Sequence, residues 1–294
     1  MAQTINIKAP AKINLVLDVV GKRPDGYHTL KSIMQSVSLY DKLGFSFSQS
    51  PDQDVVLLCE RDDFPKDKTN LIYKACMAFY EYSKVTPKGI IISVEKNIPS
   101  MAGMAGGSSD CGATLIALNQ MYETDYSKEI LCDIGEKLGA DVPFCLTGGT
   151  VLCEGIGEIL TPLPDLKDCF ILIIKPNCSI STPESYKKFD AIENPPKSDL
   201  NDMIASLVVS DLEGISKNLF NGLERATYLE EIEEIKNIMN KNNALGSAMT
   251  GSGSAVFGLF KSKKEAKDCL KHFDDNDDYF KTIVKPVNEG CIID

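Results

Sequence analysis

A glycine-rich stretch at residues 99–109 limits the architectures open to this chain more than any other segment. It lies between an expected strand at residues 89–95 and an expected helix that carries Cys111, Leu115 and Leu118 on one face. Glycines allow backbone N–H groups to turn toward a ligand, and a helix N-terminus adds unpaired donors and partial positive charge. The stretch therefore suits a polyphosphate. A flexible connection in which Ser108 or Ser109 caps the helix is the alternative that the residues leave open.

The remaining chain predicts an α+β protein built from two units. Hydrophobic periodicity predicts strands at residues 4–9, 12–20, 32–47, 170–175 and 255–260. It predicts helices at residues 69–82, 211–223 and 228–240, with Thr69 or Asn70 as the cap of the first. We expect the division near residues 162–167, which gives domains at residues 1–163 and 164–294.

Charge and composition exclude several classes of partner. The chain has 31 Lys and Arg against 42 Asp and Glu, a formal charge of −11, which disfavours a nucleic-acid polymer or an anionic membrane. A small phosphorylated ligand stays possible, because one local pocket can bind an anion. The start shows no secretory signal, no apolar run reaches the roughly 20 residues of a membrane span, and the ten Cys lack metal-type spacing. We therefore expect a cytoplasmic protein, monomeric or homodimeric.

Four motifs together resemble the GHMP small-molecule kinases, named for galacto-, homoserine, mevalonate and phosphomevalonate kinases. The pattern P-x-x-A-G-x-x-G-G-S-S-D at residues 99–110 is similar to their phosphate-binding motif. Residues 9–15, 139–144 and 249–254 resemble their N-terminal, catalytic and C-terminal glycine motifs. The resemblance covers nearly the whole chain and implies a two-domain fold with a cleft between the domains. It implies a nucleotide-binding α/β domain, a ferredoxin-like C-terminal α/β domain, and the use of ATP with Mg²⁺. Met104-Ala105 stands where the family usually has Leu-Gly, and Ser254 where Pro or Ala is common.

The resemblance also implies which residues act. Asp141 would be the base that takes a proton from a substrate hydroxyl, and Lys12 would pair with it and steady developing charge. The alternatives without a catalytic role are a solvent-exposed loop carboxylate for Asp141 and a lysine at the edge of a strand for Lys12. The ligands of the metal stay unknown, with Ser109 a candidate metal ligand or phosphate contact. The residues implied in ATP binding are Pro99, Ser100, Met101, Ala102, Gly103, Met104, Ala105, Gly106, Gly107, Ser108 and Ser109.

The start of the chain and residues 23–30 resemble one branch of the family. That branch phosphorylates the 2-hydroxyl of a methylerythritol that carries a cytidine diphosphate, in non-mevalonate isoprenoid precursor biosynthesis. The resemblance implies that Tyr27 and His28 hold the cytosine, with Tyr186 on its other face. The other implied substrate-binding residues are Asn14, Thr182, Gly251, Ser252 and Gly253. A homoserine-type or mevalonate-type kinase and a non-catalytic nucleotide-binding regulator are the alternatives.

Overall fold

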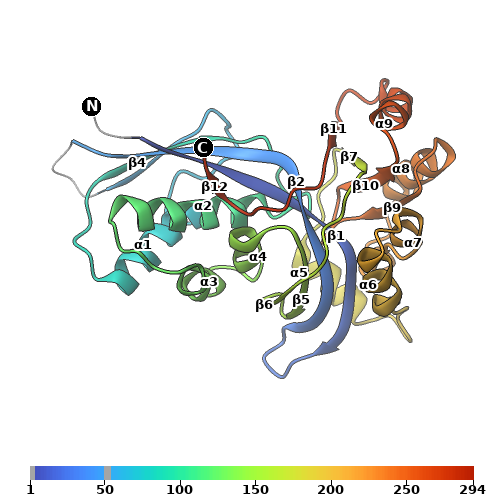
Figure 1. Cartoon of the computed structure of the whole chain (residues 1–294), viewed down its shortest axis with the longest axis horizontal. Helices are drawn as coiled ribbons and strands as arrows, with labels where there is room; N and C mark the ends of the chain where they lie inside the picture. The colour runs from blue at the N-terminus through green and yellow to red at the C-terminus, as the bar shows by residue number, and fades with distance from the viewer. Residues whose placement is uncertain (1–3, 50–53) are drawn as a thin grey trace.

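The structure is a computed structural model, and it describes residues 4–49 and 54–294. The central feature of the fold is a long antiparallel hairpin of β1 (Ile5–Lys22) and β2 (His28–Phe47), which crosses the molecule in Figure 1. The hairpin belongs to an eight-stranded sheet. The other strands of this sheet are β3 (Val55–Leu58), β4 (Ile90–Glu95), β5 (Thr150–Gly155), β6 (Ile159–Pro162), β8 (Phe220–Asn221) and β12 (Ile292–Ile293).

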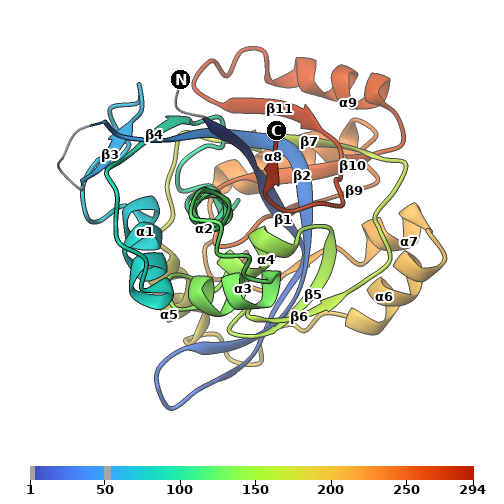
Figure 2. The ribbon, with the colours of Figure 1, turned by 60° about the vertical axis from the view of Figure 1, so that its left-hand side comes forward.

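Four helices cover one side of the first sheet. They are α1 (Leu71–Ser83), α2 (Gly106–Met121), α3 (Lys128–Glu136) and α4 (Val142–Thr147). The central helix, α2, is buried along much of its length and packs against β1, as Figure 2 shows. Asn70 caps α1, because its side chain accepts a hydrogen bond from the backbone of Ile72 at 2.9 Å. The predicted cap is therefore confirmed.

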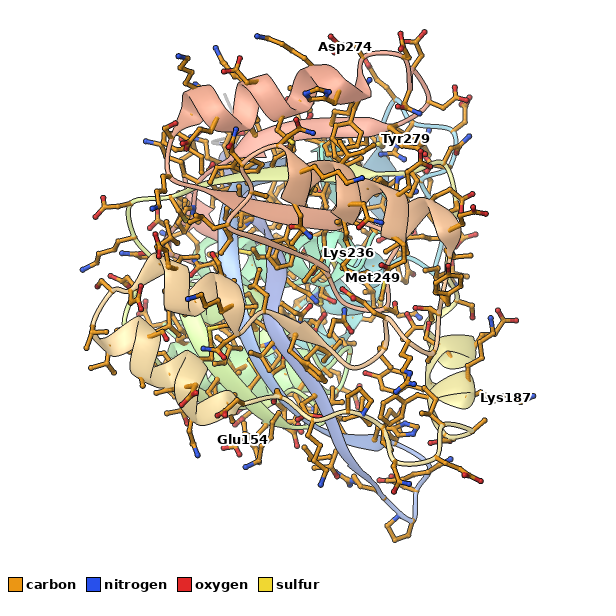
Figure 3. All side chains as sticks on the ribbon, turned by 90° about the vertical axis from the view of Figure 1, so that its right-hand side faces the viewer. Glu154, Lys187, Lys236, Met249, Asp274 and Tyr279 are labelled. Atoms are coloured by element: carbon orange, nitrogen blue, oxygen red, sulfur yellow. The ribbon has the colours of Figure 1, made fainter. Side chains whose placement is uncertain are left out.

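The second unit is a four-stranded antiparallel sheet with the order β11-β7-β10-β9. Its strands are β7 (Phe170–Lys175), β9 (Gly246–Met249), β10 (Val256–Phe260) and β11 (Phe280–Val284). Its helices are α5 (Thr182–Phe189), α6 (Leu200–Val208), α7 (Leu212–Lys217), α8 (Glu230–Lys241) and α9 (Lys263–Leu270), followed by a 3₁₀ turn, η1 (Lys271–Phe273). Met249 and Lys236, labelled in Figure 3, belong to β9 and α8 of this unit.

The side chains of β7 point alternately to its two faces and pack in two hydrophobic clusters, so this strand joins the two units. Ile171 and Ile173 lie in a hydrophobic cluster with Ile13 of the first sheet. Leu172 and Ile174 belong to another cluster with residues of α8 and α9, such as Ile235. Because successive strand residues point to opposite faces, one strand is buried on both sides and serves both clusters. The relative position of the two units is therefore fixed by hydrophobic residues that they share in their cores.

Tertiary pairing changes the predicted elements in two places and adds a strand that the sequence did not predict. The strands predicted at residues 4–9 and 12–20 are parts of one strand, β1, whose register shifts between Pro10 and Ala11, so the proline does not end the strand. The predicted helix at residues 211–223 ends as α7 at Lys217, and Phe220 and Asn221 pair with β1 instead. The last strand, β12, returns to the first sheet beside β1. In each case a distant partner strand overrode a local preference.

Two further structural features bear on the expected surroundings of the protein. All ten Cys are free thiols, and most of them are buried. In residues 4–49 and 54–294, no helix combines the length and the apolar composition that a membrane crossing needs.

Candidate active site

A cavity of about 950 Å³ lies between the two units and gathers most of the predicted site residues. Its walls come from the hairpin β1–β2, the glycine-rich stretch, the residues just before α4, and α5. Segments that are far apart in the chain therefore meet here. The predicted catalytic and substrate-binding residues that line it are Lys12, Asn14, Tyr27, His28, Asp141, Thr182, Tyr186, Gly251, Ser252 and Gly253.

Lys12 and Asp141 face each other in this cavity. Lys12 lies in β1, is 4% exposed, and its Nζ is 3.8 Å from Oδ2 of Asp141. Asp141 precedes α4, and its side chain makes no capping bond to that helix, so the carboxylate stays available for the lysine. Pro143 lies in the first turn of α4 and stiffens the segment that carries Asp141. The predicted pairing of Lys12 with Asp141 is confirmed.

Asn14 joins the N-terminal motif to the C-terminal glycine motif. Its Oδ1 accepts hydrogen bonds from Nζ of Lys12 at 2.6 Å, from the backbone N–H of Gly251 at 2.9 Å and from Oγ1 of Thr250 at 3.2 Å. Its Nδ2 donates to Oγ of Ser32 at 2.8 Å. These three donors occupy both lone pairs of the amide oxygen of Asn14. Asn14 therefore fixes Lys12 and residues 250–251 in one network at the cavity wall.

The two glycine motifs touch each other backbone to backbone. A Cβ on Gly103 would lie 2.1 Å from the carbonyl oxygen of Thr250, and a Cβ on Gly251 would lie 2.8 Å from the Cα of Gly103. Both residues also have positive φ, +72° and +57°. Only glycine satisfies the space and the backbone conformation together.

Ala105 adopts the left-handed conformation that glycine would adopt easily. Its φ is +57°, and it is the residue immediately before α2. The left-handed region costs a non-glycine residue roughly 1–2 kcal/mol. Ala105 therefore takes a conformation that favours glycine, at a position where the family usually has glycine.

The glycine-rich stretch also lines a second cavity, of about 390 Å³, that shares Met101, Gly103 and Ala105 with the first. The predicted ATP-binding residues in this second cavity are Pro99, Ser100, Met101, Ala102, Gly103, Met104, Ala105, Gly106 and Gly107, and Ser108 lines the larger one. Ser109 lies apart from both, because it is buried and its hydroxyl donates to the carbonyl of Pro10 at 2.7 Å. Its side chain ties α2 to β1, whereas the family resemblance made it a candidate metal ligand or phosphate contact.

Tyr27 is exposed, whereas His28 is partly buried. Tyr27 is 62% exposed, whereas the His28 ring stacks on Tyr186 with centroids 4.7 Å apart and an interplanar angle of 21°. One face of the Tyr186 ring is thus covered by His28, and the ring also packs against the hydrophobic cluster that contains Leu172 and Ile235. Oγ1 of Thr182 and Oγ of Ser252 are 2.8 Å apart, so α5 also contacts the C-terminal glycine motif.

A buried charge cluster under the glycine-rich stretch was missed from the sequence. Nζ of Lys96 forms ion pairs with Asp41 and, at 2.6 Å, with Asp110. Asp41 also accepts hydrogen bonds from the backbone N–H groups of Asn97 and Ile98. Oδ1 of Asp110 is buried and has no hydrogen-bond partner. A signal was available, because Asp41 interrupts an apolar strand and Lys96 directly precedes the stretch.

Comparison with known proteins gives the chain its family. Residues 70–149 match the GHMP kinases N terminal domain, and residues 203–276 match the GHMP kinases C terminal domain. A 4-diphosphocytidyl-2-C-methyl-D-erythritol kinase of Lachnoclostridium phytofermentans is 44% identical over 265 residues, with 90% of each chain covered. The same enzyme of Clostridium botulinum (strain Alaska E43 / Type E3) is 43% identical over 269 residues, covering 91% of this chain and 95% of that one.

Solved structures agree with this result. A crystal structure of 4-(cytidine 5'-diphospho)-2C-methyl-D-erythritol kinase superposes with a TM-score of 0.78 at 29% identity, covering 95% of this chain and 98% of that one. A homoserine kinase from Cytophaga hutchinsonii has a TM-score of 0.79 at 19% identity, covering 100% and 98%, and shows the shared fold alone. The predicted two-domain fold is confirmed, and the chain belongs to the GHMP kinase family.

Proposed function

We propose that this chain transfers the γ-phosphoryl group of ATP to the 2-hydroxyl of 4-diphosphocytidyl-2-C-methyl-D-erythritol. The products are the 2-phosphate and ADP, and the reaction belongs to non-mevalonate isoprenoid precursor biosynthesis. The relatives that are 41–44% identical over most of their length carry this activity in their names. The observation that carries the proposal is the Lys12–Asp141 pair, in one cavity with both glycine motifs and Tyr27.

Asp141 and Lys12 would divide the chemistry. The carboxylate of Asp141 takes the proton of the 2-hydroxyl as the new O–P bond forms and the bond from the γ-phosphorus to the departing ADP breaks. Lys12 holds the carboxylate in place and offsets negative charge that develops nearby. Asn14 keeps Nζ of Lys12 directed into the site through the 2.6 Å hydrogen bond to Oδ1.

The donor set fits a Mg²⁺ that arrives with ATP. In the described residues no group of three or more His, Cys, Asp or Glu side chains could hold an ion unaided. Magnesium typically takes one or two protein ligands and leaves the remaining positions to phosphates and water. Ser108 and Asp141, which line the cavity beside the glycine-rich stretch and Lys12, are oxygen donors that could complete its coordination. When bound, the ion would neutralise phosphate charge.

The same proposal assigns the remaining roles. The N-terminal domain at residues 1–163 binds ATP through the glycine-rich stretch, and the domain at residues 164–294 contributes α5 and residues 251–253 to the substrate side. Backbone N–H groups at the start of α2 face phosphate oxygens, as helix N-termini do. We also propose a cytoplasmic location and a monomer or homodimer.

ADP release against three acceptors tests the proposed function. The purified chain, given ATP and Mg²⁺, is offered the cytidylyl substrate, mevalonate and homoserine in separate coupled assays. We expect turnover with the cytidylyl substrate alone. Turnover with mevalonate or homoserine instead would assign the chain to another branch of the family. Nucleotide binding without ADP release would indicate a regulator.

Replacing the exposed ring of Tyr27 distinguishes the binding site of the cytidylyl substrate from that of ATP. We expect Tyr27→Ala to raise the KM for the cytidylyl substrate about tenfold with little effect on that for ATP, because base–aromatic stacking is worth about 1–3 kcal/mol. Steady-state kinetics with each substrate varied measures both constants. Tyr27→Phe retains the ring and should behave like the wild type. Tyr228→Ala removes another exposed Tyr that lines neither cavity and serves as the control. Equal changes in both KM values would rule out stacking on Tyr27.

A further inference from the structure

Asp190, at the end of α5, holds two side chains of the β1–β2 hairpin. Its Oδ1 is 2.7 Å from Nε2 of His28, and its Oδ2 accepts a hydrogen bond from Nζ of Lys22 at 2.5 Å. Figure 3 shows α5, marked by Lys187, beside the closed end of the hairpin. Both carboxylate oxygens are therefore used in contacts between the two units. Asp190 lines the larger cavity together with His28.

The His28 ring is held on one face and at one edge. Tyr186 stacks on the face, and Asp190 takes the Nε2 edge, while the side chain keeps 10% exposure. Within residues 4–49 and 54–294, no side chain or backbone group forms a hydrogen bond with Nδ1 of His28. Nδ1 is therefore the ring atom that stays available to a ligand.

A carboxylate determines which ring nitrogen carries the proton. An ionised carboxylate only accepts hydrogen bonds, and the pKa of Asp190 lies below its usual range because of the hydrogen bond from His28 and then that from Lys22. Nε2 must therefore be the protonated nitrogen. Lys22 forms an ion pair with the same carboxylate, which keeps Asp190 ionised and in place beside the ring. A neutral ring with the proton on Nε2 presents a lone pair at Nδ1.

We propose that Asp190 is a positioning residue that holds His28 in the Nε2–H tautomer, so that Nδ1 accepts a hydrogen bond from the exocyclic amino group of cytosine. Uracil has a carbonyl oxygen at that position, and two acceptors repel each other. The pair would therefore select a cytidine diphosphate over a uridine diphosphate. The choice of base rests on the proposed function, whereas the tautomer is a property of the free protein.

The tautomer can be read directly, because the chain contains only His28 and His272. We would label histidine with ¹⁵N and record the ring nitrogens of the full chain by NMR at pH 8, with His272→Gln to leave a single signal set. We expect a protonated Nε2 and an unprotonated Nδ1 on His28. A proton on Nδ1, or on both nitrogens, would overturn the proposal without reference to any substrate.

Binding of CDP and UDP tests the selectivity. Calorimetry should show CDP binding at least about tenfold tighter than UDP, in line with the discrimination that one base contact provides. In Asp190→Asn the amide can donate to Nε2 and move the ring proton to Nδ1, so the CDP to UDP ratio should fall about tenfold. Glu184→Gln, a carboxylate on the same helix outside the cavity, should keep the wild-type ratio.

The outcomes separate the two hypotheses. A purely structural Asp190 would weaken both nucleotides equally in Asp190→Asn and leave their ratio unchanged, which would refute the positioning role. If neither nucleotide binds to the wild type, the base selectivity fails together with the proposed function, and the ¹⁵N spectrum still decides the tautomer. Should Asp190→Asn fail to fold, the wild-type spectrum and the wild-type ratio of affinities still test the proposal.

Discussion

Asp141→Asn should lower kcat by about 100-fold or more while the affinity for ATP stays nearly unchanged. A general base contributes about 10²–10⁴-fold to a proton-transfer step, and the amide cannot accept the proton of the hydroxyl. Asn keeps the size of the side chain and can still contact Lys12, whose Nζ also bonds to Asn14. Steady-state turnover and calorimetric ATP binding measure the two quantities.

The control for Asp141 is a nearby carboxylate with no place in the site. Asp133 is exposed on α3 and lines neither cavity, so Asp133→Asn should retain wild-type turnover. Thermal unfolding of both variants checks that the fold is intact. Wild-type turnover in Asp141→Asn would remove this residue from the mechanism.

Lys96→Met should destabilise the fold by about 3–5 kcal/mol, the usual cost of removing one partner from a buried ion pair. The change would leave Asp41 and Asp110, both almost fully buried, without their shared cation. The cluster lies directly under the glycine-rich stretch, so the loss should also weaken ATP binding. Urea unfolding, followed by circular dichroism, gives the free energy of unfolding.

Three further variants show whether the cluster has this role: Lys42→Met, Lys96→Met combined with Asp110→Asn, and Asp110→Asn alone. Lys42→Met breaks an exposed pair with Glu95 and should cost less than about 1 kcal/mol. Lys96→Met combined with Asp110→Asn should recover part of the loss, because Asp41 keeps its two backbone donors. A Lys96→Met variant as stable as Lys42→Met would contradict the expected contribution of the cluster.

The cluster also predicts a pH dependence of stability. Burial, opposed by Lys96 and reinforced by Asp41, raises the pKa of Asp110 to about 8. In the unfolded chain an Asp titrates near 3.9, so the folded state binds the extra proton between these values. The contribution of this proton is present below about pH 4 and is lost as the pH rises through about 8. Asp110→Asn, the third variant, should flatten this part of the stability profile.

Local patterns in the sequence were enough to place the main elements and the core of the site. The strand predicted at residues 170–175 is β7, and the helix at residues 69–82 is α1 within two residues. The glycine-rich stretch lies between β4 and α2 as expected. These elements follow from which face of a segment is apolar, a property carried by a few neighbouring residues. Motif resemblance also predicts the pairing of Lys12 with Asp141.

Pairings between distant residues that no motif marks were beyond the reach of the sequence. His28 and Asp190 are 162 positions apart, and nothing in the residues around Asp190 marks it as a partner of a histidine. The short strand β8 formed where a helix was expected, because the backbone of β1 offered its residues hydrogen bonds. The family resemblance made Ser109 a candidate ligand contact, whereas its hydroxyl donates a hydrogen bond to the carbonyl oxygen of Pro10.

The sequence by itself thus determined the family, the elements and the chemical groups available for phosphoryl transfer. Only the tertiary structure decided which charges are buried together, as in Lys96 with Asp41 and Asp110, and which ring nitrogen of His28 faces a carboxylate. The physical reason is that periodicity and turn chemistry act over a few residues. The pairing of buried polar groups, by contrast, depends on how whole layers pack and on which groups lose their water together.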